Sequence, residues 1–464
     1  STELKEDFFQ AHLNLGAVLK DLGQLQEAQL SLRKAIELNP NLFNSHFLLG
    51  TILIGQKKLK EAEQSLRKTI ELNPDFFQAH LALGGLLGEL GNFQEAEIST
   101  RKAIEIKPDY AEAHSNLGNI LRDLGNLQEA EISYGKAIEI KPNFAEAHYN
   151  LGNIFKDLGK SKEAEISFSK SIELNPDLTI AVMNRARLFF EEEEFDKALR
   201  DSDSCNTEES RAFSLEILFA LGRVEETYKR IETTSKLDNE NIRLAAFSSF
   251  IIEQESKETS NNFCRNPLSF LYFSNLKNHR KDYEDLSSKI MNDLSKVKTI
   301  WEPKSKATRY GFQTPSNLNL FSEPSKNISL LKSIILNELD AYYSKYKKES
   351  CSYIKKWPSN KNLYAWHVIL KKQGYQSAHI HPSGWLSGVI YLKVVPPLGK
   401  DEGAIEFSLN STNYSDLESP KLIHQPKLGD IVFFPSSLHH RTIPFTTDTE
   451  RIIVSFDLKP ETAR

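Results

Sequence analysis

The chain has 464 residues, 26% of them charged, and a formal net charge of −5. This length leaves room for about two to four domains, each with its own hydrophobic core. The nearly balanced charge argues against a broad electrostatic grip on nucleic acid or on an anionic membrane. No stretch of the sequence reaches the roughly 20 apolar residues of a membrane helix. We therefore expect neither a nucleic-acid partner nor a membrane partner.

The number and spacing of the cysteines indicate in which cellular compartment the protein is expected. Cys205, Cys264 and Cys351 are far apart and include no CxxC pair. An odd number of scattered cysteines supports neither a disulfide framework nor a zinc site. Because free thiols persist in reducing surroundings, we expect a cytoplasmic protein.

A 34-residue period runs through the first part of the chain, with alanine or serine at one phase and glycine five residues later. The positions are Ala11, Ser45, Ala79, Ala113, Ala147 and Ala181, with Gly16, Gly50, Gly84, Gly118 and Gly152. Each unit predicts two helices, of which the first ends near a Leu-Gly pair and the second ends at a proline. Proline fits there because its fixed φ and missing N–H stop a helix.

This period and its residues resemble the tetratricopeptide repeat over residues 10 to about 200. The resemblance implies a right-handed superhelix whose concave face is lined by the first helices, and the family usually holds peptides on that face. We therefore expect a protein or peptide partner on the concave face.

Two polar residue types recur in the predicted first helices. The histidines His12, His46, His80, His114 and His148 stand a whole repeat apart, which argues against a shared metal ion. The asparagines Asn14, Asn116, Asn150 and Asn184 share one phase, and Asn119 and Asn153 lie one turn further on. Each amide offers both a donor and an acceptor, so a ladder formed by Asn116, Asn119, Asn150, Asn153 and Asn184 would pair with the backbone of an extended peptide substrate. The alternative is that asparagine is merely tolerated at this position.

From about Lys298 the composition changes to strand-like runs rich in Ile, Val, Phe and Tyr, following a helix predicted over Ile328 to Lys347. The runs are Tyr364 to Lys371, Ser387 to Val395, Ala404 to Leu409, Asp430 to Phe434 and Arg451 to Leu458. Several short strands suggest a barrel or jelly roll. The sequence therefore predicts a multidomain α + β protein: an α-helical tetratricopeptide-repeat superhelix (1–200), a degenerate helical connector (201–297) and a cupin-like, jelly-roll double-stranded β-helix (298–464).

Histidines and an arginine follow one another in these strands in an order typical of an iron site inside a β-barrel. The motifs are His379-x-His381, Ser387 to Leu392, Gly403 to Phe407, Phe434 to Ser436, His440 to Pro444 and Arg451. Together they resemble the 2-oxoglutarate- and Fe(II)-dependent oxygenases of the HxHP…SGVYY type and, more distantly, the prolyl hydroxylases. The resemblance covers residues 300 to 460 and implies Fe(II) and the co-substrate 2-oxoglutarate.

The residue types suit this chemistry. An HxH pair on a strand points both imidazoles to the same side, and a distant histidine on a neighbouring strand completes the ligand set. The resemblance assigns the metal to His379, His381 and His440, and it favours His440 over the adjacent His439, which we expect to point to the opposite side of its strand. Arg451 would pair with the distal carboxylate of 2-oxoglutarate through its planar fork of donors.

Other positions stay open between a role in the site and simple packing. Tyr391 and Ser455 match family positions that hydrogen-bond the same carboxylate. Trp366 and Trp385 are candidates for lining the substrate mouth.

The first motif departs from the prolyl hydroxylases, in which it is HxD, because His381 takes the place of the carboxylate. Either three histidines hold the metal, as in some cupin dioxygenases, or His381 turns away and water replaces the carboxylate, as in aspartyl β-hydroxylases. A third possibility is that Glu406 supplies a carboxylate, although its strand resembles a non-ligating segment of the family.

These features predict an enzyme that decarboxylates 2-oxoglutarate to succinate and CO2 while it hydroxylates a protein or peptide side chain held by the repeats. The substrate inference rests on analogy between folds. The alternatives are a non-catalytic repeat scaffold whose barrel only binds, and a small-molecule oxygenase whose repeats assemble a complex.

Overall fold

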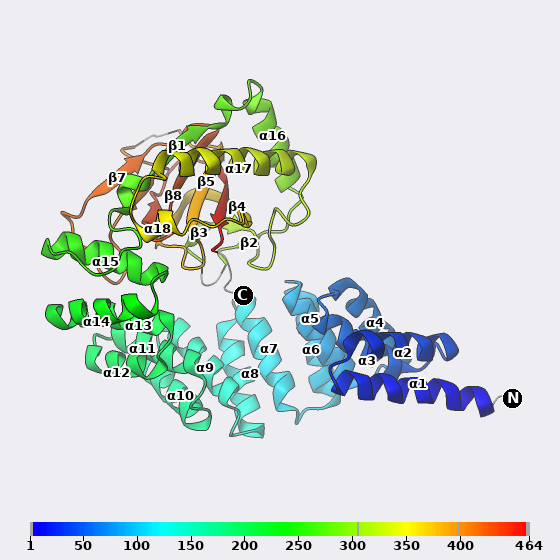
Figure 1. Cartoon of the computed structure of the whole chain (residues 1–464). Helices are drawn as coiled ribbons and strands as arrows, with labels where there is room; N and C mark the ends of the chain where they lie inside the picture. The colour runs from blue at the N-terminus through cyan, green and yellow to red at the C-terminus, as the bar shows by residue number, and fades with distance from the viewer. Residues whose placement is uncertain (1–2, 304–305, 397–398, 461–464) are drawn as a thin grey trace. The chain divides into compact units, whose positions relative to one another are not determined.

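A computed structural model describes residues 3–303, 306–396 and 399–460. The chain divides into two compact units, Ser1–Glu194 and Phe195–Arg464 (Figure 1). The division at residues 200 and 297 expected from the sequence stays a prediction. Among the described residues, no helix combines the length and the apolar character that crossing a membrane requires.

The first unit is an array of antiparallel helix pairs, in which the first helices of successive pairs contact one another. The helices are α1 (Glu3–Asp21), α2 (Leu25–Leu38), α3 (Phe43–Gly55), α4 (Leu59–Leu72), α5 (Phe77–Glu89), α6 (Phe93–Ile106), α7 (Ala111–Asp123), α8 (Leu127–Ile140), α9 (Ala145–Asp157), α10 (Ser161–Leu174) and α11 (Thr179–Glu191). This arrangement confirms the predicted helical superhelix.

Small residues let the two helices of a pair approach closely. A Cβ on Gly118 would stand 2.8 Å from the Tyr134 ring, and a Cβ on Gly152 would stand 2.7 Å from the Phe168 ring. Both separations are shorter than a van der Waals contact, so the repeated glycine is required where a large aromatic residue fills the partner helix.

The recurring histidines fasten each first helix to the turn before it. In His46, His80, His114 and His148, Nε2 lies 2.8–3.1 Å from the carbonyl oxygen of the proline six residues earlier. Because a carbonyl only accepts, each imidazole donates its N–H there. The periodicity of these histidines is therefore structural, and they do not gather into a metal site.

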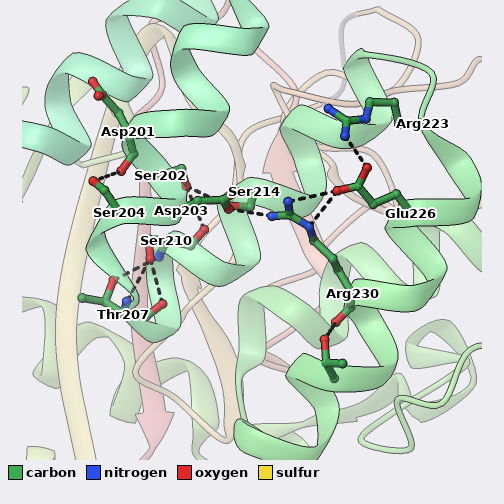
Figure 2. A network of polar contacts seen from close by, with 11 residues as sticks. Asp201, Ser202, Asp203, Ser204, Thr207, Ser210, Ser214, Arg223, Glu226 and Arg230 are labelled. Atoms are coloured by element: carbon green, nitrogen blue, oxygen red, sulfur yellow. Dashed lines mark hydrogen bonds and ion pairs between the residues drawn. The ribbon is translucent and has the colours of Figure 1, made fainter.

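The second unit begins with four helices, α12 (Phe195–Cys205), α13 (Glu208–Ala220), α14 (Val224–Leu237) and α15 (Ile242–Glu255). Figure 2 shows a polar network that joins the first three of these helices. Asp203 of α12 accepts hydrogen bonds from Arg230 of α14 at 2.6 Å and from Ser214 of α13 at 2.7 Å. Arg230 also pairs with Glu226 at 3.0 Å. The network fixes how the three helices pack.

Among the described residues, ten strands follow, connected by short helices and by one long helix. The strands are β1 (Tyr272–Asn275), β2 (Ile300–Trp301), β3 (Thr308–Gln313), β4 (Leu363–His379), β5 (Leu386–Lys393), β6 (Ile405–Ser408), β7 (Lys421–His424), β8 (Asp430–Pro435), β9 (His439–Thr442) and β10 (Arg451–Leu458). The helices are η1 (Pro267–Phe270), η2 (Leu276–Asn278), α16 (Tyr283–Leu294), α17 (Lys326–Tyr346) and α18 (Ser352–Lys355). The strand order is β1-β8-β5-β10-β4-β9-β6-β7, with β3 also on β4 and β2 on β3.

The long strand β4 turns the sheet. Its first half pairs with β10 from Leu363 to Leu370, and its end pairs with β9 at His379. Gln373, between the two halves, has a φ of 62°. This break redirects the strand, so that the antiparallel sheet curves into the half-barrel of a jelly-roll-like domain, as predicted.

The two faces of the sheet have different partners, as the two-residue alternation of a strand requires. Ile431 and Phe433 of β8 share a core with α16 and α17, whereas Val432 and Phe434 belong to a second cluster that fills the interior of the barrel. Figure 1 shows α17 lying across the outer face. The interior side therefore carries the residues that make up the site.

Candidate functional site

Three histidines meet inside the curved sheet. His379 ends β4, His381 lies two residues beyond the strand, and His440 in β9 stands opposite His379 in register. One ligand atom from each of the three lies within 4.8 Å of the others. The ring centroids are 4.3 Å apart for His379 and His440 and 5.0 Å apart for His381 and His440. The structure thus brings together the three metal ligands expected from the sequence.

Hydrogen bonds orient each imidazole. Nδ1 of His379 lies 2.7 Å from the Ser377 carbonyl oxygen, and Nδ1 of His440 lies 3.2 Å from the Leu438 carbonyl oxygen. These oxygens only accept, so Nδ1 carries the proton and the lone pair remains on Nε2. Nδ1 of His381 lies 2.6 Å from the Asp457 carboxylate. All three rings can therefore present Nε2 to a metal.

Burial keeps two of the clustered histidines neutral. It lowers the pKa of His379 to about 3 and lowers the pKa of His440 well below its ordinary value. The ring of Phe434 lies 4.5 Å from that of His440 and helps to exclude water. Metal binding requires unprotonated imidazole, and these two histidines meet that condition at neutral pH.

Asp457 is a member of the site that the sequence prediction missed. Its Oδ1 accepts from Nδ1 of His381 and, at 2.7 Å, from the Ser387 hydroxyl, which also contacts Ser436 at 2.8 Å. Burial alone would raise the Asp457 pKa, but His381, Lys459 and Ser387 outweigh this effect and hold the pKa below its usual value. The sequence offered one signal for this role: Asp457 is a charged residue between Phe456 and Leu458 in a strand that is otherwise mostly apolar.

Arg451 of β10 is 1% exposed and carries a charge into the barrel. Its Nη1 donates to the Thr442 hydroxyl at 2.7 Å and its Nη2 donates to the Tyr391 hydroxyl at 3.1 Å. Its Nε has no hydrogen-bond partner, and none of the ion pairs found among the described residues includes this guanidinium. An unpaired buried charge costs several kcal/mol, so this position suits an anionic ligand.

The arginine and the histidines belong to one interior. Thr442, which binds Arg451, lies two residues after His440 in β9, so their side chains project to the same side. Two residues of an extended strand span roughly 7 Å. The guanidinium of Arg451 and the histidine cluster therefore face the same interior of the sheet.

The remaining candidates are placed in different ways. Tyr391 is fully buried and bonded to Arg451. Ser455 shares a strand face with Arg451 but stands four residues, or roughly 13 Å, along β10, and no hydrogen bond joins the two among the described residues. Trp366 is half-buried, and its ring lies 5.4 Å from that of His381. It lies beside the cluster.

Trp385 faces away from the site. It is 2% exposed, its indole N–H donates to the Tyr353 carbonyl at 3.0 Å, and its ring packs 5.0 Å from Phe263 in the core beneath the helices. This placement favours the packing alternative, because residues on the outer side of the sheet do not reach its interior.

The structure also separates the alternatives for the metal ligands. His439 points away from the cluster and packs against Tyr414, with ring centroids 5.7 Å apart. Glu406 lies on the outer side of β6, where Arg441 clamps both carboxylate oxygens at 2.8 and 2.9 Å. Because its carboxylate is held by Arg441, Glu406 is not placed to complete the histidine cluster.

In the repeats, part of the asparagine ladder is bonded internally. Asn184 donates to Asn153 at 2.8 Å, and Tyr134 donates to the Asn119 oxygen at 2.8 Å. Asn116 and Asn150 occupy the equivalent phase of α7 and α9 and are partly exposed. Their contact with a peptide stays a prediction.

Family models of the tetratricopeptide repeat match residues 9–42, 31–64, 53–115, 100–132, 118–159 and 145–178. The family model described as "Putative 2OG-Fe(II) oxygenase" matches residues 364–457. The chain therefore joins tetratricopeptide repeats to a C-terminal domain of this oxygenase family. A search of curated proteins found no match.

Solved repeat structures resemble parts of the chain. MamA is 26% identical, with a TM-score of 0.33, over 35% of this chain and 94% of MamA. YrrB, described as a TPR protein with an unusual peptide-binding site, is 24% identical, with a TM-score of 0.34, over 37% of this chain and 88% of YrrB. A tetratricopeptide repeat protein from Parabacteroides merdae is 22% identical, with a TM-score of 0.41, over 50% of this chain and 93% of that chain.

Another buried histidine, His367 of β4, gives a prediction on pH. Its Nδ1 lies 2.9 Å from the Thr314 hydroxyl, Nε2 has no partner, and burial lowers its pKa to about 4. In the unfolded chain the His367 imidazole binds a proton as the pH falls below about 6.5, whereas in the folded chain it stays neutral until about pH 4. The free energy of unfolding therefore decreases as the pH falls from about 6.5 to about 4.

We expect the wild type to lose about 2 kcal/mol more unfolding free energy than His367→Gln between pH 7.5 and pH 5. Urea unfolding followed by tryptophan fluorescence measures this difference in the second unit, because all four tryptophans lie between residues 301 and 385. If the unfolding free energies of the two proteins changed with pH in parallel, His367 would not be the source of the pH dependence.

Proposed function

We propose that this chain is a 2-oxoglutarate- and Fe(II)-dependent dioxygenase that hydroxylates a side chain of a protein or peptide. One observation carries the proposal: a cluster of three oriented histidines and an unpaired buried arginine occupy the same barrel interior. The family match over residues 364–457 supports it independently.

His379, His381 and His440 would hold the metal. Neutral imidazoles suit Fe(II), and three protein ligands leave positions for the co-substrate and for oxygen. When bound, Fe(II) and 2-oxoglutarate supply the oxidative chemistry, in which 2-oxoglutarate and O2 yield succinate, CO2 and a hydroxylated C–H bond.

Arg451 would bind the distal carboxylate of 2-oxoglutarate. Its unpartnered Nε offers a charge-assisted hydrogen bond, while Thr442 and Tyr391 hold the guanidinium in place. Burial and the Phe434 ring keep water away from this interior, which strengthens both the ion pair and the metal contacts.

A protein or peptide substrate is favoured because the domain is fused to tetratricopeptide repeats, which generally bind peptides or proteins. Asn116, Asn119, Asn150, Asn153 and Asn184 would hold the peptide backbone along the first helices. Trp366 would contact the reacting segment, since its ring lies beside His381.

The metal ligand gives the first test. His440→Ala should abolish Fe(II)- and 2-oxoglutarate-dependent succinate formation and reduce metal uptake. His439→Ala, one residue earlier but directed at Tyr414, should retain metal uptake. Mass spectrometry of succinate and metal analysis of the purified proteins measure both effects. A wild type that takes up no metal and forms no succinate would leave only the scaffold alternative.

The co-substrate arginine gives the second test. Arg451→Gln should raise the 2-oxoglutarate concentration for half-maximal succinate formation about 30-fold or more, because the loss of a buried charge partner costs at least about 2 kcal/mol. Arg441→Gln is the control, since this arginine pairs with Glu406 on the outer side of the sheet. Equal 2-oxoglutarate dependence in wild type and Arg451→Gln would refute the assigned role.

Removal of residues 1–194 tests the substrate class. If the repeats present a peptide, the shortened enzyme should lose activity on that peptide while it still decarboxylates 2-oxoglutarate in the absence of substrate. A small-molecule oxygenase would instead keep its full activity on its substrate. Product analysis by mass spectrometry distinguishes the two results.

A further inference from the structure

We propose that Asp457 is a positioning residue that orients His381 toward the metal and supplies, through that imidazole, the negative charge that an HxD motif would provide directly. The inference rests on the metal cluster of the proposed function. It also accounts for the absence of a carboxylate from the first motif.

The orientation of His381 is fixed on two sides. Its Nδ1 donates to Asp457 at 2.6 Å, and its backbone N–H donates to the Ser436 carbonyl at 3.0 Å. Ser387 donates to the same carboxylate oxygen at 2.7 Å and meets the Ser436 hydroxyl at 2.8 Å. The ring therefore cannot turn away without breaking a connected polar network, which argues against the water-substituted alternative.

The charge of Asp457 is directed mainly at His381. The residue is 4% exposed, and its second oxygen lies 3.6 Å from Nζ of Lys459, a longer contact than the 2.6 Å to His381. A carboxylate that accepts from the N–H of a ligating histidine raises the basicity of that ligand and holds its tautomer. Asp457 can thus strengthen the metal site without touching the metal.

Strand β10 contributes a charged residue to each end of the proposed site. Arg451 and Asp457 are six residues apart in β10, so both side chains lie on the face of the strand that lines the barrel interior. The arginine serves the co-substrate end, and the aspartate serves the metal end. The other nearby carboxylate, Glu406, is held on the outer side by Arg441.

The experiment measures Co(II) affinity by titration of visible absorption, without 2-oxoglutarate or substrate, so that it does not depend on turnover. Asp457→Asn keeps the shape of the side chain and removes its charge. It should weaken Co(II) binding about 10- to 100-fold and shift the absorption bands, and Asp457→Glu should recover part of the affinity.

Glu338→Gln is the matched control. Glu338 is also a buried carboxylate paired with a histidine, His279, but it lies on α17, outside the cluster, and accepts hydrogen bonds from Tyr272 and Ser274 of β1. This variant should lose stability and keep the Co(II) affinity of the wild type. If Asp457→Asn does not fold, Ser387→Ala replaces it, because it removes a donor to Asp457 and leaves both partners present.

Equal Co(II) affinity in the wild type and in the folded Asp457→Asn or Ser387→Ala protein would overturn the inference. A wild type that takes up no Co(II) would overturn it together with the proposed metal site. A wild type whose Co(II) affinity depends on Asp457 but which forms no succinate with Fe(II) would overturn the dioxygenase proposal and support this inference.

Discussion

The pairing of one strand with two partners is the constraint on which the candidate site depends. β4 follows β10 through its first half and meets β9 at its end. The first pairing sets Arg451 and Asp457 beside β4, and the second sets His440 opposite His379. If either register slipped by one residue, the histidines or the charged residues would move to the outer side of the sheet. The helices packed on that outer side keep the sheet in this register by burying Ile431, Phe433 and their neighbours.

Most of the fold could be predicted from the sequence, because its strongest signals are a regular repeat and apolar runs of strand length. The repeats follow from a 34-residue period, and five of the strands follow from apolar runs. Several other strands were not predicted, for physical reasons. β2 has two residues, β7 is largely exposed, and in β9 (His, His, Arg, Thr) only the threonine is a typical strand former. Their pairing depends on tertiary contacts that no local pattern records.

Prediction of the site from the sequence is limited in the same way, because contacts between distant residues leave no local pattern. His379, His381 and His440 could be proposed from spacing, and the structure gathers them. Asp457 could not, because its importance arises from a hydrogen bond across the sheet to a residue 76 positions away in the chain. Trp385 is a different case, because its aromatic side chain suited both a substrate wall and simple packing. Its contact with Phe263 in the core beneath the helices favours packing.

The loop between β6 and β7 has a consequence for where the chain can be shortened. Tyr414 in that loop packs 4.6 Å from Phe250 and 5.2 Å from Phe247 of α15, and Gln254 binds Asp416 at 2.9 Å. The helices before the barrel therefore complete its surface. A fragment that began at the change in composition near Lys298 would lack α15 and strand β1 and would expose Tyr414. The smallest fragment that keeps these contacts therefore begins with α13, where Glu216 accepts a hydrogen bond from Asn413.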